Sequence, residues 1–413
     1  MDDLTYLDLL PVETTEPETT YIFKHIITQE VAYSTLLFSQ RHQLHRTVAE
    51  WYEVNHGGEL DALAPYYPLL VHHYHHAEDA EQERHYAGLA GQQAARQYAN
   101  AEAIRYFSRA LILTPENDLA AQYELRLARE RVYDLRGERE AQQQDLIALA
   151  ALVEPDRAEA LDSRRVEIAL RQAHYAETTG DYLAATISAE RALAESRAQG
   201  ALLDESRSLN LLGLIARRQG RYDAAISWYE QAITVLSRNT LEADQLSRAL
   251  IQALNGLGIV LRQQGDFSRA RQYYERALTL SRQIGDRRLE AELLNSLGVT
   301  AFYRRNLAEA IDFYQQALLI RQTIGDRGGV GTTLFNLATA IRNIGDYGQA
   351  LDYYREALAI QQAVDNRWEQ VNIWNSMGIA YQELGNFAEA QSCLARGVEL
   401  AQAIGDEIGV AYL

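Results

Sequence analysis

Residues 251–290 read IQALNGLGIVLRQQGDFSRARQYYERALTLSRQIGDRRLE, and residues 291–330 read AELLNSLGVTAFYRRNLAEAIDFYQQALLIRQTIGDRGGV. Both segments carry a Leu-Gly pair, an aromatic pair and a closing Gly-Asp at the same positions. The turn that divides each segment recurs with spacings of 40, 45, 40, 40 and 40 residues, at Gly180, Gly220, Gly265, Arg305, Gly345 and Gly385. Self-similarity at a fixed period of this length indicates a repeat array.

Each repeat has the pattern of two antiparallel helices. Ala270, Tyr274 and Ala277 lie four and three residues apart, so they share one helix face. Glycine ends the first helix because that position needs a positive φ, and the Asp or Asn after it caps the second helix. One pair cannot bury its apolar face alone, so the sequence predicts an all-α solenoid of stacked pairs.

This pattern resembles the tetratricopeptide repeat (TPR), whose usual unit has 34 residues. The 40-residue spacing resembles the long-helix repeats of kinesin light chain and related scaffolds. The resemblance implies a superhelical array of about eight units over 84–404, near 84–117, 123–156, 166–199, 206–239, 251–284, 291–324, 331–364 and 371–404. Residues 405–413 match the start of a truncated ninth unit.

One step of the array is 45 residues long, and its five extra residues lie near Asn239–Gln245. Units of a solenoid contact only their nearest neighbours, so a local insertion need not interrupt the array. We therefore expect a longer loop or a helix extension there, with the stacking continued across it.

Residues 1–80 lack the repeat. Leu4–Leu10 and Tyr21–Phe23 predict two short strands, and a long amphipathic helix should follow over about Thr28–Trp51. The stretch 21–53 resembles the end of the winged-helix domain in bacterial signal-transduction ATPases of the STAND type, many of which join a cyclase or regulator domain to an ATPase and then to TPRs. This resemblance implies a partial winged-helix segment over 1–55 and a helical connector over 56–83.

In such ATPases a Phe-x-His motif can place its histidine near the β-phosphate of bound ADP, and Phe23 and His25 match that motif. The sequence contains no G-x-x-x-x-G-K-[ST] phosphate loop. The resemblance thus implies that the chain is the C-terminal part of a larger protein, with an upstream ATPase domain as a partner. His25 would contact nucleotide only in that full-length protein.

In TPRs the first helix of each unit lines the concave surface. A series of Asn and Arg or Tyr residues recurs at two levels of these helices, at Asn210, Asn255, Asn295, Asn336 and Asn375, and at Arg217, Arg262, Tyr303 and Arg342. An Asn amide can donate to and accept from one peptide unit, and the planar guanidinium of Arg binds carboxylates. We expect these residues to bind an extended peptide or protein segment that contains acidic residues. The alternative is that each Asn bonds to a neighbouring helix.

Three other features favour structural roles. The stretch Gly325–Thr333 is rich in glycine but lacks a lysine that could reach a phosphate, and the repeat places it at an inter-unit turn. His72 and His76 would share a helix face, as a metal-binding pair would, but no acid or cysteine completes an obvious ligand set. Cys393 takes the place of a core aromatic, which favours a buried thiol.

Composition narrows the function classes. The net charge of −18 argues against nucleic acid as a partner, because phosphate binding needs a concentrated basic face. No apolar run approaches the roughly 20 residues that span a membrane, and residues 1–20 contain no basic residue for a secretory signal, so we expect a cytoplasmic protein. No catalytic, cofactor-binding or metal-binding motif stands out.

The leading hypothesis is a non-catalytic TPR sensor and protein-interaction array that regulates the ATPase of a larger signalling protein. One alternative is a free-standing TPR scaffold that binds a peptide. Another is the C-terminal part of a nucleotide cyclase with ATPase and TPR domains. A phosphate loop encoded before residue 1 would separate the first and third hypotheses from the second.

Overall fold

The computed structural model describes residues 12–14, 20–21, 31, 33–57, 62–154, 164–237 and 244–412. The chain divides into two compact units, Met1–Ile168 and Ala169–Leu413, and each is described by itself. The helices form stacked pairs throughout both units, which confirms the predicted all-α TPR solenoid.

The first unit contains a short antiparallel strand pair and the first helices. Strand β1 (Val12–Thr14) pairs with β2 (Thr20–Tyr21). The helical elements follow in the order α3 (Phe38–His56), η1 (Ala64–Tyr66), α4 (Tyr67–His76), α5 (Ala80–Arg96), α6 (Asn100–Leu113), α7 (Leu119–Arg136) and α8 (Arg139–Leu152). Helix α9 (Arg165–Thr178) crosses the boundary between the units.

The described part of residues 1–80 differs from the sequence prediction in two places. Strand β1 lies within the stretch that was expected to be a loop, whereas Leu4–Leu10 lies outside the described residues. The expected continuous helix over Thr28–Trp51 is wrong, because Leu37 is extended (φ −63°, ψ 153°) and α3 begins only at Phe38.

Side-chain hydrogen bonds explain this break. The side-chain Oε1 of Gln40 accepts from the Leu37 N–H at 2.9 Å, and the Arg41 guanidinium donates to the backbone carbonyls of Ser34 (2.7 Å) and Leu36 (3.0 Å). Because these backbone groups already have side-chain hydrogen-bond partners, they do not need a continuous helix to supply them.

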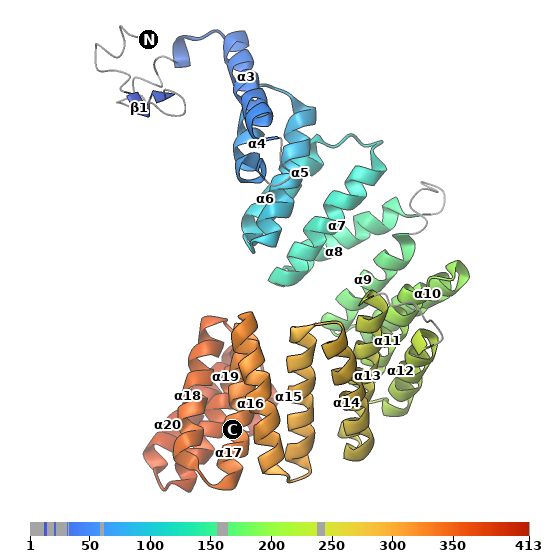
Figure 1. Cartoon of the computed structure of the whole chain (residues 1–413), viewed down its shortest axis with the longest axis vertical. Helices are drawn as coiled ribbons and strands as arrows, with labels where there is room; N and C mark the ends of the chain where they lie inside the picture. The colour runs from blue at the N-terminus through green and yellow to red at the C-terminus, as the bar shows by residue number, and fades with distance from the viewer. Residues whose placement is uncertain are drawn as a thin grey trace. The chain divides into compact units, whose positions relative to one another are not determined.

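The second unit is a row of longer helix pairs, and α13 to α16 stand side by side in Figure 1. Its helices are α10 (Tyr182–Gln199), α11 (Leu202–Arg218), α12 (Tyr222–Ser237), α13 (Asp244–Gln263), α14 (Phe267–Gln283), α15 (Arg287–Tyr303), α16 (Leu307–Ile324), α17 (Arg327–Ile344), α18 (Tyr347–Ala363), α19 (Arg367–Glu383), α20 (Phe387–Ala403) and α21 (Glu407–Tyr412). The first helices α11, α13, α15, α17 and α19 also contact one another from unit to unit. They therefore form one continuous layer.

The Leu-Gly pair marks the place where the two helices of a repeat touch. A Cβ atom on Gly298 in α15 would lie 2.5 Å from Cε1 of Tyr314 in α16, and one on Gly258 would lie 2.6 Å from Cε1 of Tyr274. Both tyrosines are buried. Glycine is therefore needed for the tyrosine ring to pack against the backbone of the first helix.

The structure on both sides of the 45-residue step agrees with the prediction of a longer element and continued stacking. Residues 238–243 lie outside the described part of the chain. Helix α13 has 20 residues, and one apolar cluster joins Ala225 and Tyr229 before the step to Ile251 and Leu254 after it. A helix extension and continued stacking are thus confirmed.

Candidate ligand-binding groove

Half-buried side chains form a stripe along each first helix of the second unit. On α13 the stripe consists of Asn255, Ile259 and Arg262, and the residues between them are mostly buried. Its members recur one unit apart, at Asn210, Leu214 and Arg217; Asn295, Val299 and Phe302; Asn336, Thr339 and Arg342; and Asn375 and Ile379. Because the first helices form one layer, the stripes align into a continuous surface with an amide level, an apolar level and an arginine level.

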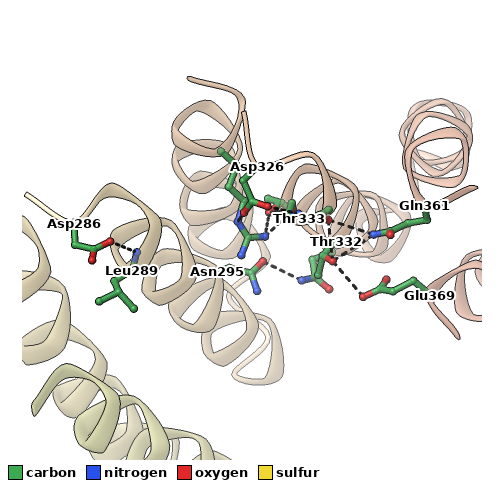
Figure 2. A network of polar contacts seen from close by, with 12 residues as sticks. Asp286, Leu289, Asn295, Asp326, Thr332, Thr333, Gln361 and Glu369 are labelled. Atoms are coloured by element: carbon green, nitrogen blue, oxygen red, sulfur yellow. Dashed lines mark hydrogen bonds and ion pairs between the residues drawn. The ribbon is translucent and has the colours of Figure 1, made fainter. Parts of the chain in front are cut away.

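The amide level links adjacent first helices. Asn210 Nδ2 donates to the Ala249 carbonyl at 3.1 Å, and Asn255 Nδ2 donates to Glu292 Oε1 at 3.0 Å. Asn336 Nδ2 donates to Asn295 Oδ1 at 3.0 Å, a contact drawn in Figure 2. Bonding to a neighbouring helix is therefore present, and these amides help to fix the spacing between units.

Two of these amides keep an unused acceptor. The Oδ1 atoms of Asn210 and Asn255 are buried and have no hydrogen-bond partner within the described chain. A buried acceptor without a partner costs roughly 1–3 kcal/mol, and these oxygen atoms expose no surface, so an amide must turn before a ligand N–H can reach its Oδ1.

The arginine level carries guanidinium groups that have no carboxylate partner in the described chain, and those of Arg217 and Arg262 interact with the hydroxyls of Tyr229 and Tyr274. Arg217 Nε, Arg262 Nε and Arg342 Nη1 are buried without a hydrogen-bond partner, and these guanidinium groups form no ion pair with a described residue. Several arginines elsewhere form ion pairs, as in Arg218–Glu177 (3.0 Å) and Arg271–Glu309 (2.7 Å). These half-buried arginines are therefore candidates for binding an external carboxylate.

Aromatic side chains position two of these arginines. Burial raises the pKa of Tyr229 to about 12, and the nearby positive charge of Arg217 opposes that rise. The Arg262 guanidinium lies 5.8 Å from the centre of the Tyr303 ring, and that ring stacks on Phe267 at 6.2 Å. Tyr303 is 56% exposed, so it offers a ligand an aromatic surface beside a cation.

Most of the glycine-rich stretch forms the start of α17, and side chains of the protein itself bind to it (Figure 2). Arg321 is buried, and its Nη1 donates to the Gly329 carbonyl at 2.7 Å and to Thr333 Oγ1 at 2.6 Å. Gln361 Nε2 donates to the Gly328 carbonyl at 3.3 Å. These contacts support the structural interpretation of the stretch Gly325–Thr333.

Sequence reasoning missed the polar group next to that turn. Thr332 Oγ1 donates to Glu369 Oε1 at 3.2 Å, which joins α17 to α19, and burial raises the pKa of Glu369. The two residues are 37 positions apart, which is close to one repeat. The spacing of the repeat could therefore have indicated this contact, but the residue types differ from those of the Asn series.

The remaining candidate residues from the sequence analysis are His25, Cys393 and the histidines of a possible metal site. His25 lies outside the described residues. Cys393 is buried in an apolar cluster, and burial raises the pKa of its thiol. Within the described ranges, no group of three or more His, Cys, Asp or Glu residues has the arrangement of a metal site. No helix in those ranges is long and apolar enough to cross a membrane.

Sequence comparison identifies the repeats. Models of the tetratricopeptide repeat match residues 208–243 and the overlapping segments 249–323, 289–363 and 330–403. These segments are therefore tetratricopeptide repeats. No curated protein sequence matches the chain significantly.

Several solved structures share the fold. The apo form of the quorum sensor NprR from B. thuringiensis is 13% identical, with a TM-score of 0.61 over 84% of this chain and 99% of that one. A STAND protein with a tetratricopeptide repeat sensor, from Pyrococcus horikoshii, is 13% identical, with a TM-score of 0.57 over 100% of this chain and 60% of that one. A Rap protein complexed with competence and sporulation factor is 12% identical, with a TM-score of 0.51 over 80% and 95%. At these identities the likeness shows the fold alone.

Proposed function

We propose that this chain is a non-catalytic sensor array that binds an extended, acidic peptide or protein segment along its first helices. The observation that carries the proposal is the arginine level, where three half-buried arginines lie in register without a carboxylate partner in the described chain. The half-buried amides of Asn210 and Asn255 support it, because an Asn side chain that turns outward can donate to and accept from one peptide unit of an extended main chain.

We further propose that ligand binding regulates an ATPase domain in a larger protein. The support is the STAND protein with a tetratricopeptide repeat sensor, of which this chain spans 60% of the length. Binding that favours one curvature of the array would bias the attached domain by the difference in affinity between the two states. The partial winged-helix segment over 1–55 and the eight units over 84–404 are parts of the same proposal.

Selection of random peptides on the intact chain tests the binding function. The arginine level predicts that the selected peptides are enriched in Asp and Glu. The Arg262→Gln/Arg342→Gln variant serves for counter-selection, because it keeps the shape of the groove and removes two charges. Selected peptides with no acidic enrichment, or with equal affinity for the variant, would show that the groove does not recognise them through these arginines.

Replacing Asn255 and Asn295 by Ala should weaken binding of a selected peptide roughly ten- to a hundredfold and leave the helical content intact. Each lost neutral hydrogen bond contributes about 0.5–1.5 kcal/mol. Fluorescence anisotropy measures the affinity, and circular dichroism measures the helical content. Unfolding of the variant would mean that the bonds to Glu292 and Asn336 are the main role of these amides.

The isolated chain should not bind ATP tightly, because its sequence has no phosphate loop. Isothermal titration calorimetry with ATP and Mg²⁺ measures this. Micromolar binding of ATP would contradict the proposal that a separate ATPase domain binds the nucleotide.

A further inference from the structure

Four histidines meet where α3 packs on α4. His45 of α3 and His73 of α4 are joined by a hydrogen bond of 2.8 Å between their Nδ1 atoms. The His45 ring also stacks on His76 at 4.9 Å, and it meets the edge of His72 at 5.8 Å. Three residues of α4 thus surround one residue of α3.

The hydrogen bond between His45 and His73 limits how many protons the pair can hold. One ring must donate and the other must accept through an unprotonated nitrogen. The other nitrogen of His45, Nε2, lies 2.9 Å from Tyr33 Oη. Two neutral rings hold two protons, and a third makes one ring a cation that can still donate to the other. A fourth proton would remove the acceptor and place two cations in contact, next to two further imidazoles.

We propose that this histidine cluster (His45, His72, His73 and His76) is a pH-sensitive latch that holds the N-terminal half of α3 on α4 when the rings are neutral and releases it when they are protonated. The latch lies within residues 1–80, and it does not depend on the proposed groove of the second unit.

The charged groups around the cluster do not neutralise its protonated form. On α3, Arg41 and Arg46 add positive charge, and Arg46 is paired with Asp79 at 2.9 Å. Glu83 of α5 accepts from Arg109 of α6 at 2.6 Å and 3.0 Å, and it also contacts His75 of α4. Glu78, in the turn after α4, lies 3.8 Å from His42 and is mostly exposed. The nearby carboxylates are therefore already engaged or screened by solvent.

The proton affinities agree with this geometry. Burial, followed by repulsion from His45, His72 and His76, lowers the pKa of His73 from 6.5 to about 4. Burial and neighbouring histidines also lower the pKa of His45 and of His76, although Glu83 opposes the shift at His76. Groups with lowered pKa bind protons more tightly once the contact opens, so the latch weakens as pH falls from about 6.5 towards 4. At pH 5 the shift of His73 alone favours opening by about 30-fold.

The C-terminal half of α3 has a separate anchor. Ala49 is buried with Leu70 of α4, and the Glu53 carboxylate accepts from Tyr74 Oη at 2.8 Å and from Tyr86 Oη at 2.6 Å. This anchor contains no histidine. Acid should therefore release the part of α3 up to about Arg46 and leave the rest in place.

Hydrogen exchange on the full chain tests the latch at about pH 7.5 and about pH 5, after correction for the intrinsic exchange rate. We expect amide protection over Phe38–Arg46 to fall about 30-fold at the lower pH, with a smaller change over α13. In the His45→Phe/His73→Phe variant this dependence on pH should disappear, whereas His85→Phe, at an exposed position on α5, should keep it.

Equal protection at both pH values in the unmodified chain would overturn the proposal, and so would an unchanged pH dependence in the double variant. If the double variant does not fold, an NMR titration of the imidazole protons of the unmodified chain decides. The proposal requires at least two histidines that titrate well below the ordinary range, and histidines that all titrate near 6.5 would contradict it.

Discussion

Replacing Tyr314 by alanine is expected to lower the free energy of unfolding by about 3–5 kcal/mol, the range for removing a large buried aromatic side chain. Tyr314 is buried between the two helices of its repeat, against Gly298, and the cavity would open in the middle of the array. Equilibrium denaturation followed by circular dichroism measures the change. Phe387→Ala is the matched control, because Phe387 is 68% exposed and its loss should cost no more than about 0.5 kcal/mol.

A double-mutant cycle shows whether the contact between Gly298 and Tyr314 is the cause. Gly298→Ala alone should cost about 1–3 kcal/mol, because the new methyl group would crowd the Tyr314 ring. In the Tyr314→Ala background the same change should cost less, since the ring that the new methyl group would meet is absent. Strictly additive costs would mean that the two residues do not limit each other.

The double variant Arg262→Gln/Arg342→Gln is expected to weaken binding of an acidic peptide by about a hundredfold or more. Each charge-assisted hydrogen bond contributes about 1.5–3 kcal/mol, and two are removed. The fold should persist, because neither arginine forms an ion pair with a described residue. Fluorescence anisotropy with a selected acidic peptide measures the loss.

Arg271→Gln is the matched control for the groove. It removes the same charge from the second helix α14, where Arg271 is paired with Glu275 and Glu309 at 2.7 Å each. Its effect on binding should be within a fewfold, since a distant surface charge is screened by salt. Equal losses for Arg271→Gln and the double variant would mean that the peptide responds to overall charge and not to the groove.

The helix pairs could be predicted from the sequence because their causes are local. Glycine turns, Asp or Asn caps and alanines at helical spacing recur every 40 residues, and the structure has a helix pair at each recurrence. The break before α3 could not be predicted in this way. It depends on how the side chains of Gln40 and Arg41 bind backbone groups of residues up to seven positions away.

The groove was harder to predict than the fold. The repeat spacing placed the Asn and Arg residues in register, but their bonding depends on how closely adjacent units stack. Asn336 is one place out of register, and it reaches Asn295 instead of a backbone carbonyl. The meeting of His45 with His73 likewise depends on the packing of α3 on α4, which no local pattern specifies.

The most direct test of the groove is photo-crosslinking from a selected acidic peptide that carries one photoreactive residue at its centre, followed by mass spectrometry. We expect crosslinks to the first helices α13, α15 and α17, within a turn of the arginine level at Arg262 and Arg342, and their loss in the Arg262→Gln/Arg342→Gln variant. Crosslinks concentrated on the second helices α14, α16 and α18 would contradict it.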